Sequence, residues 1–91
     1  MRLEGKVALI SGGARGQGGQ ESRLFSREGA KVIIGDILEE EGRKTEREIN
    51  DAGGEALYVK LDVTKSEDWR GAVETAVTQF GKLNVLVNNA A

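Results

Sequence analysis

The sequence contains no cysteine, no histidine and no proline among its 91 residues. Without cysteine and histidine, the chain can form no disulfide and has no thiolate nucleophile, no imidazole base and none of the usual zinc ligands. A metal site would need oxygen ligands alone, and no metal-binding residues are nominated from the sequence. Aromatic residues are few, with two phenylalanines, one tyrosine and one tryptophan. Chemistry in this chain must therefore rest on backbone groups, carboxylates, hydroxyls, amides and cationic side chains.

Long apolar runs and clusters of like charge are also missing. The apolar run at residues 7–10 is far too short for a signal sequence or a membrane span. The 13 basic and 15 acidic residues are intermixed and give a net charge of −2, so no basic patch for a nucleic acid is present. We therefore expect a cytoplasmic protein that binds neither membranes nor nucleic acids.

Short apolar runs alternate with amphipathic segments along the chain. The apolar runs predict strands over residues 7–10, 31–36, 56–61 and 83–87, and their continuity is typical of strands covered on both faces. The intervening spacing predicts helices over 17–28 and 38–52, and a third that begins at an N-cap, Thr64 or Ser66, and reaches residue 80. The third helix is expected to pack one stripe in the core: Trp69, Val73, Ala76, Val77 and Phe80.

Strands that alternate with helices across short loops are typical of right-handed βαβ crossovers and a parallel sheet. The pattern predicts a single α/β domain over residues 1–91, with the strands in the spatial order 3-2-1-4. The fourth strand would then be an open, apolar edge. We expect an isolated chain of this kind to self-associate.

A glycine-rich loop follows the first predicted strand. Gly12 would allow a tight turn out of the strand, Gly16 would let a diphosphate approach the backbone, and Gly18 would let the helix pack close to the sheet. Free N–H groups and the helix dipole favour a pyrophosphate at this position. Taken alone, the loop is weak evidence, because a tight strand-to-helix connection that binds no ligand is the alternative interpretation.

Asp36 ends the second predicted strand, 18 residues after Gly18. An acidic side chain there can accept hydrogen bonds from the adenosine ribose hydroxyls, and its charge would repel a 2′-phosphate. NAD is therefore favoured over NADP as the cofactor. Arg15, in the glycine loop, is a cation that could partly offset this preference.

These motifs, in this order, resemble the short-chain dehydrogenase/reductase family over the whole chain. The family's glycine motif T-G-x-x-x-G-x-G corresponds to Ser11–Gly18, where the serine hydroxyl can still bond backbone in the turn. Asp62 and Val63 match an Asp-Val pair after the third strand, and residues 88–91 match an N-N-A-G segment with alanine at its last position. The resemblance implies the first half of a doubly wound Rossmann sheet, truncated after the fourth strand.

The resemblance also assigns cofactor contacts to particular residues. The diphosphate would be lined by Arg15, Gly16 and Gln17 beside Gly12 and Gly18, the adenosine ribose by Asp36 and Ile37, the adenine by Asp62 and Val63, and the region towards the nicotinamide by Asn88 and Ala90.

For the complete protein, the resemblance implies hydride transfer between NAD and a secondary alcohol or ketone. It also implies a homo-oligomer, either a dimer or a tetramer. The loop over residues 36–42 and the pair Asp68 and Trp69 are most similar to the subgroup that includes hydroxysteroid and sugar dehydrogenases.

Catalytic residues of this family, a Ser and a Tyr and Lys in the pattern Y-x-x-x-K, lie beyond the fourth strand. The chain has one tyrosine, Tyr58, and four residues after it stands Asp62 rather than a lysine. We expect Tyr58 to be a strand side chain half buried against a helix, and nominate no catalytic residue. Two alternatives stay open: a non-catalytic dinucleotide-binding module, and a non-functional fragment of a truncated gene.

Overall fold

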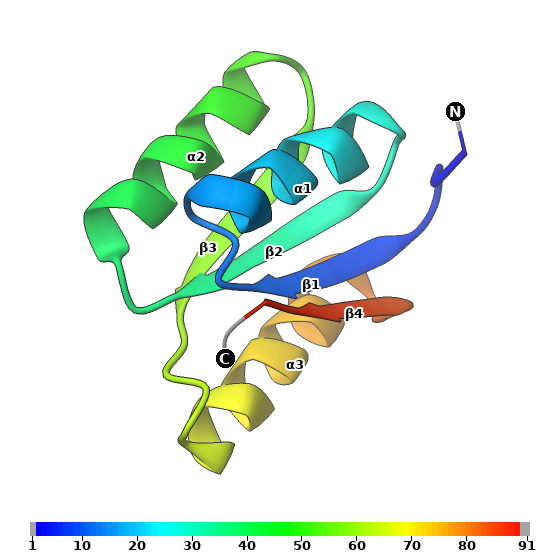
Figure 1. The fold of residues 1–91 in the computed structure, drawn as a ribbon. Coiled ribbons are helices and arrows are strands. Elements are labelled where there is room, and N and C mark those ends of the chain that lie inside the picture. The colour runs from blue at the N-terminus through cyan, green and yellow to red at the C-terminus, as the bar shows by residue number, and fades with distance from the viewer. Residues whose placement is uncertain (1, 90–91) are drawn as a thin grey trace.

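Four parallel strands form the centre of the fold, and helices cover both faces of the sheet (Figure 1). The structure, a computed structural model, describes residues 2–89. The elements along the chain are β1 (Val7–Ser11), α1 (Gly16–Arg27), β2 (Lys31–Asp36), α2 (Glu39–Asp51), β3 (Glu55–Lys60), α3 (Ser66–Phe80) and β4 (Val85–Asn88). Each lies within two residues of its predicted position.

The strands lie in the order β3-β2-β1-β4, which confirms the predicted Rossmann-type sheet. At the carboxyl edge, Ser11 of β1 lies between Gly35 of β2 and Asn88 of β4, and Asp36 lies beside Lys60 of β3. Because the strands are parallel, the loops that leave them all begin at this edge. The predicted site residues within residues 2–89 are thereby brought to one edge of the sheet.

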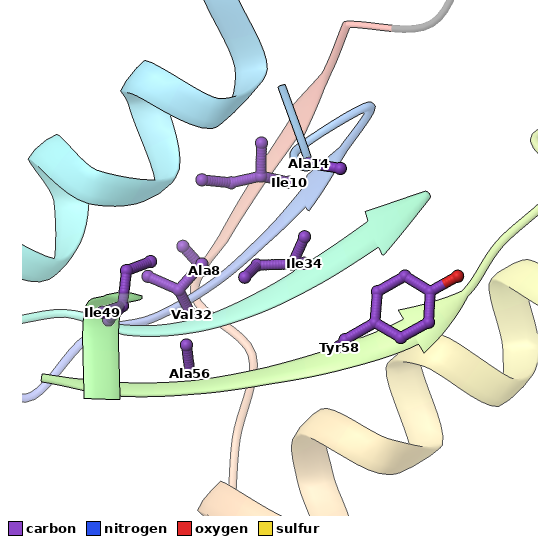
Figure 2. Packing of buried hydrophobic residues seen from close by; sticks show 8 residues of the cluster. All are labelled: Ala8, Ile10, Ala14, Val32, Ile34, Ile49, Ala56 and Tyr58. Carbon is purple, nitrogen blue, oxygen red and sulfur yellow. The ribbon is translucent and has the colours of Figure 1, made fainter. Parts of the chain in front are cut away.

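Two clusters of buried side chains fill the spaces between the sheet and its helices. The cluster beneath α1 and α2 (Figure 2) contains Ala8, Ile10, Ala14, Val32, Ile34, Ile49, Ala56 and Tyr58. The cluster on the opposite face, beneath α3, contains Val7, Leu9, Ile33, Leu61, Ala72 and Ala76. All five residues of β1 are buried, as expected for a strand covered on both faces.

The buried line on α3 differs from the predicted stripe. Ala72 and Ala76 are buried, whereas Val73 and Val77 are 38% and 49% exposed. The two alanines have small side chains that let the helix backbone approach the sheet, and each valine lies one position further round the helix. The prediction that both valines pack in the core was therefore wrong.

Tyr58 on β3 is buried against α2 rather than half buried. The residue is 7% exposed, and its ring packs over Gly42, where a Cβ atom would overlap the ring. Its hydroxyl donates a hydrogen bond to the backbone carbonyl oxygen of Asp36 at 2.7 Å. Burial, followed by the negative charges of Glu39 and Asp36, raises the pKa of the Tyr58 hydroxyl above its ordinary value.

We expect Tyr58 to make the free energy of unfolding fall at alkaline pH. In the unfolded chain a tyrosine ionises at a pKa of about 10, whereas the folded pKa is higher, so the unfolded state loses its proton first. This contribution is complete below the unfolded pKa and is lost as the pH rises through the folded pKa. Urea unfolding from about pH 8 to pH 11 measures the effect. The Tyr58→Phe variant should show a shallower decline, and equal slopes for the two proteins would contradict the prediction.

Strand β4 forms one edge of the sheet. It pairs with β1 on one side, and no strand within residues 2–89 pairs with its other side. Leu86 is 56% exposed and lies on the α3 face, because its register partner Leu9 belongs to the cluster beneath α3. An exposed strand edge with an apolar side chain is a template for pairing with another chain.

The 91-residue chain is therefore expected to self-associate through β4, and Leu86→Lys should weaken this association. Because Leu86 is largely exposed, the substitution should change stability by only about 0.5 kcal/mol. Leu24→Lys, at a 45% exposed leucine on α1, is a matched control that should leave the association unchanged. Sedimentation velocity over a range of concentrations makes the comparison. A monomer at every concentration, or an equal effect of the two substitutions, would rule out pairing through β4.

Candidate functional site

The loop between β1 and α1 turns sharply at the carboxyl edge of the sheet. Gly12 has a φ of +64°, in the left-handed region that residues other than glycine rarely adopt. Its N–H group and that of Gly13 both donate to the carbonyl oxygen of Gly35, at 2.7 and 3.3 Å. These two hydrogen bonds connect the turn after β1 to the end of β2.

The two later glycines of the loop differ in what they contribute. Gly16 has a φ of +60°, and the space that a Cβ atom would occupy there is open. At Gly18, in contrast, a Cβ atom would overlap the carbonyl oxygen of Gly12, so α1 can lie this close to the loop only with glycine. An open backbone followed by close helix packing is the arrangement that a dinucleotide-binding turn needs.

The first turn of α1 leaves backbone donors available. Arg15 occupies the N-cap position with an extended backbone and makes no side-chain cap, and the N–H of Gly19 donates to its carbonyl oxygen at 3.0 Å. The N–H groups of Gly16, Gln17 and Gly18 precede this bond and lie at the positive end of the helix dipole. This end of α1 can bind an anion.

Asp36 ends β2 with its side chain held in a fixed orientation. The residue is 8% exposed. Its Oδ2 accepts a hydrogen bond from the N–H of Ala14 at 3.2 Å, and its Oδ1 accepts one from the N–H of Leu38 at 3.0 Å. Each carboxylate oxygen has two lone pairs, so both keep the capacity to accept a further donor such as a ribose hydroxyl.

A cavity of about 120 Å³ adjoins Asp36, and we call it the Asp36 cavity. It is lined by Gly12, Asp36, Ile37, Leu61, Asp62 and Val63. All of these residues except Leu61 were predicted to contact the cofactor. Leu61 was predicted only as part of the third strand. Leu61 is 2% exposed and packs against Gly35, whereas Ile37 is 58% exposed, which leaves a large apolar side chain available to a ligand.

A larger cavity of about 440 Å³ lies between α1 and α2, and Arg23, Arg27 and Gly54 are among its lining residues. None of the predicted site residues lines it. Arg27 and Gly54 come just before β2 and β3, so this cavity lies near the amino edge of the sheet. Open parallel sheets bind ligands at the carboxyl edge, which favours the smaller Asp36 cavity.

Asp62, after β3, is held by its neighbours. The hydroxyl and the N–H of Thr64 both donate to its Oδ1, at 2.6 and 3.0 Å, and these bonds lower the pKa of the Asp62 carboxyl below its ordinary value. The N–H of Asp62 donates to Oδ2 of Asp68 at 2.8 Å.

The N-cap of α3 is Lys65, without a side-chain cap. The prediction of Thr64 or Ser66 as N-cap was wrong, because the Thr64 hydroxyl bonds to Asp62 instead.

Side chains at the end of β4 bond to β1 and α1. The Ser11 hydroxyl donates to Oδ1 of Asn88 at 2.8 Å, so it links two strands rather than bonding backbone within the glycine turn. The side-chain amide of Asn89 donates to the carbonyl oxygen of Ser11 at 3.2 Å and to Oε1 of Glu21 at 2.6 Å. Asn89 entered the sequence analysis only as part of the N-N-A-G match, and its bond to Glu21 was not predicted, since no spacing relates the two residues. Ala90 lies outside the described residues.

The residues at the carboxyl edge can bind and orient a ligand. No serine, tyrosine or lysine is among the residues that line the Asp36 cavity. Within residues 2–89, no group of three or more acidic, histidine or cysteine side chains could hold a metal ion. In the same part of the chain, no helix has the length and apolarity to cross a membrane.

Comparison with known proteins gives the same family over nearly the whole chain. Residues 6–91 match the family model for short chain dehydrogenase. A 3-alpha-(or 20-beta)-hydroxysteroid dehydrogenase of Mycobacterium tuberculosis is 60% identical over 89 residues, which cover 98% of this chain and 33% of that protein. A 2,5-dichloro-2,5-cyclohexadiene-1,4-diol dehydrogenase of Sphingobium indicum is 51% identical over 89 residues, which cover 98% of this chain and 36% of that protein.

A solved structure agrees in fold. The hydroxysteroid dehydrogenase from Escherichia coli matches with a TM-score of 0.95 and 33% identity, over 99% of this chain and 38% of that one. The chain spans about a third of the length of the curated relatives it matches. From the matched residues, the strand order and the glycine turn together, we conclude that the chain belongs to the short chain dehydrogenase family.

Proposed function

We propose that this chain forms the cofactor-binding part of an NAD-dependent oxidoreductase that transfers a hydride between NAD and a secondary alcohol or ketone. One observation carries the proposal: the Asp36 carboxylate lies in the wall of the same cavity as Gly12 and accepts a hydrogen bond from the N–H of Ala14, two residues before the start of α1. An anion-binding helix end and a ribose-binding carboxylate are then adjacent.

The spatial order of the strands supports a specific path for the dinucleotide. From β3 to β4, the carboxyl edge presents Asp62, then Asp36, then the glycine loop, then Asn88. This is the order of adenine, adenosine ribose, diphosphate and nicotinamide ribose along the cofactor. We assign Asp62 and Val63 to the adenine, Asp36 and Ile37 to its ribose, Gly12, Arg15, Gly16, Gln17 and Gly18 to the diphosphate, and Asn88 and Ala90 to the nicotinamide side.

Cofactor choice in this proposal depends on Asp36. The carboxylate would accept hydrogen bonds from the 2′- and 3′-hydroxyls of the adenosine ribose and would repel a 2′-phosphate. The Arg15 side chain is exposed at the start of α1, so solvent screens its attraction for a phosphate. NAD is therefore proposed as the cofactor, with NADP bound more weakly.

The chain's own residues bind and orient the cofactor rather than move protons. When bound, the nicotinamide supplies the hydride acceptor or donor. The Tyr58 hydroxyl is committed to the carbonyl oxygen of Asp36, so Tyr58 is not the general acid. The relatives named above are dehydrogenases of hydroxysteroids and of a cyclic diol, and we propose a secondary alcohol carried on a ring as the substrate class.

For the complete protein we propose a homo-oligomer, a dimer or tetramer, in the cytoplasm. A non-catalytic dinucleotide-binding module remains a second candidate for this chain, because no serine, tyrosine or lysine is among the residues that line the Asp36 cavity. Both candidates require dinucleotide binding by the same residues, so the first experiment is a binding measurement.

Calorimetric titration of the chain with NAD and with NADP tests the proposal. We expect saturable binding with a preference for NAD, and a fall of about tenfold or more in NAD affinity on Asp36→Ala, because hydrogen bonds to a charged group are lost. Asp36→Asn keeps one side-chain oxygen as acceptor for the backbone and should abolish the preference without unfolding the loops. Asp51→Ala, at an exposed carboxylate at the end of α2, is the matched control.

Two results would count against the proposal. The absence of binding at millimolar concentrations of either dinucleotide, by a chain that circular dichroism shows to be folded, would overturn it. An equal loss of NAD affinity in the Asp51→Ala control would remove the special role of Asp36.

A further inference from the structure

Two buried hydroxyl groups outside the Asp36 cavity hold the backbone on either side of it. The Thr45 hydroxyl on α2 donates to the carbonyl oxygen of Ala14 at 2.6 Å, and the Tyr58 hydroxyl on β3 donates to the carbonyl oxygen of Asp36 at 2.7 Å. Thr45 is 3% exposed and Tyr58 is 7% exposed, and neither lines the cavity. Neither residue therefore contacts a ligand in the Asp36 cavity; Thr45 lines a separate cavity beside Arg15 and Gly16, where its hydroxyl donates to the carbonyl oxygen of Ala14.

The two hydroxyl bonds converge on residue Asp36: Tyr58 bonds its backbone carbonyl oxygen, and Thr45 is linked to its carboxylate through Ala14. Ala14, whose carbonyl oxygen is held by Thr45, donates its N–H to Oδ2 of Asp36. A continuous series of hydrogen bonds therefore runs from Thr45 through Ala14 and Asp36 to Tyr58. This series connects α2, the glycine loop, β2 and β3. It includes the Asp36 carboxylate, which is proposed to select the cofactor.

The Tyr58 ring is itself tightly placed. Gly42 lies against it where any Cβ atom would overlap the ring, and the Arg43 guanidinium lies 5.2 Å from the ring centre. Figure 2 shows the ring at one end of the buried cluster, with its oxygen pointing away from Ala56. A ring held from α2 fixes its hydroxyl, so the carbonyl oxygen of Asp36 has a partner with little freedom to move.

Position matters because the proposed selection between NAD and NADP is electrostatic. A carboxylate fixed beside the ribose must face a 2′-phosphate, whereas a carboxylate free to rotate can turn towards solvent and relieve the repulsion. Resting on the proposed function, we propose that Thr45 and Tyr58 are positioning residues for cofactor choice: they fix the backbone at Ala14 and Asp36 so that the carboxylate cannot move away from a 2′-phosphate. Their loss lowers selectivity for NAD more than it lowers affinity for dinucleotides in general.

A simpler role for the two hydroxyls is the satisfaction of buried carbonyl groups, with no consequence for selectivity. The two roles differ in their dependence on Asp36. If the hydroxyls act through the carboxylate, their removal changes the ratio of NAD to NADP affinity only while the carboxylate is present. If they only stabilise the fold, the change is the same with or without it.

The experiment measures the dissociation constants of NAD and NADP for Tyr58→Phe and Thr45→Val, each in the wild-type and the Asp36→Asn background. With Asp36 present, we expect the NAD preference to fall about two- to tenfold for each variant, the range for loss of one hydrogen bond. In the Asp36→Asn background the ratio should not change further. Thr45→Ser, which keeps the hydroxyl, should restore the preference. Thr75→Val, which removes a hydroxyl bonded to Gly71 within α3, should leave the ratio as in the wild type.

The outcomes separate this inference from the proposed function. If the wild type prefers NAD, Asp36→Asn abolishes the preference, and Tyr58→Phe and Thr45→Val leave the ratio unchanged, the inference fails and the proposed function stands. Equal changes of the ratio in both backgrounds would also overturn the inference. If the folded wild-type chain binds neither dinucleotide, both fail together. Thermal unfolding of each variant verifies that the ratio is measured on folded protein.

Discussion

The buried carboxylate of Asp36 is the group on which the local fold and the proposed cofactor site both depend. Removing a carboxylate from water is costly unless hydrogen-bond donors replace the lost water, and the N–H groups of Ala14 and Leu38 replace it here. Ala14 belongs to the glycine loop and Leu38 to the turn before α2, so one side chain fixes two loops. The carboxylate oxygens of Asp36 can each accept a further hydrogen bond, and Asp36 lines a cavity. Its structural role and its proposed binding role therefore depend on the same group.

Most of the fold and much of the site could be predicted because both follow from local patterns. Apolar runs of strand length, separated by amphipathic segments that end at glycines, determine the βαβ order. Once the strands are parallel, the loops after them must meet at one edge. Gly12 and Asp36 could therefore be grouped from their sequence positions, and the family resemblance added Asp62 and Val63; all four line one cavity. Their contacts with a dinucleotide stay a prediction.

The features that could not be predicted depend on contacts between distant parts of the chain. The hydrogen bonds of Thr45 with Ala14 and of Asn89 with Glu21 join residues 31 and 68 positions apart, and no spacing rule relates such pairs. The rotation of α3 was also misjudged by one position. Periodicity could not distinguish a line through Val73 from one through Ala72, because the choice depends on how closely the helix approaches the sheet. The small side chains of Ala72 and Ala76 allow the helix to approach the sheet closely, so the line through these alanines is the buried one.

In the proposed function a dinucleotide lies along the carboxyl edge of the sheet, across the glycine loop and the Asp36 cavity. Titration of ¹⁵N-labelled chain with NAD, followed by amide chemical shifts, is the sharpest test of this placement. We expect saturable shifts at Gly16, Ile37 and Val63 and none at Arg27 or Gly54, which line the larger cavity. Shifts confined to the larger cavity, or no saturable shifts in a folded chain, would contradict it.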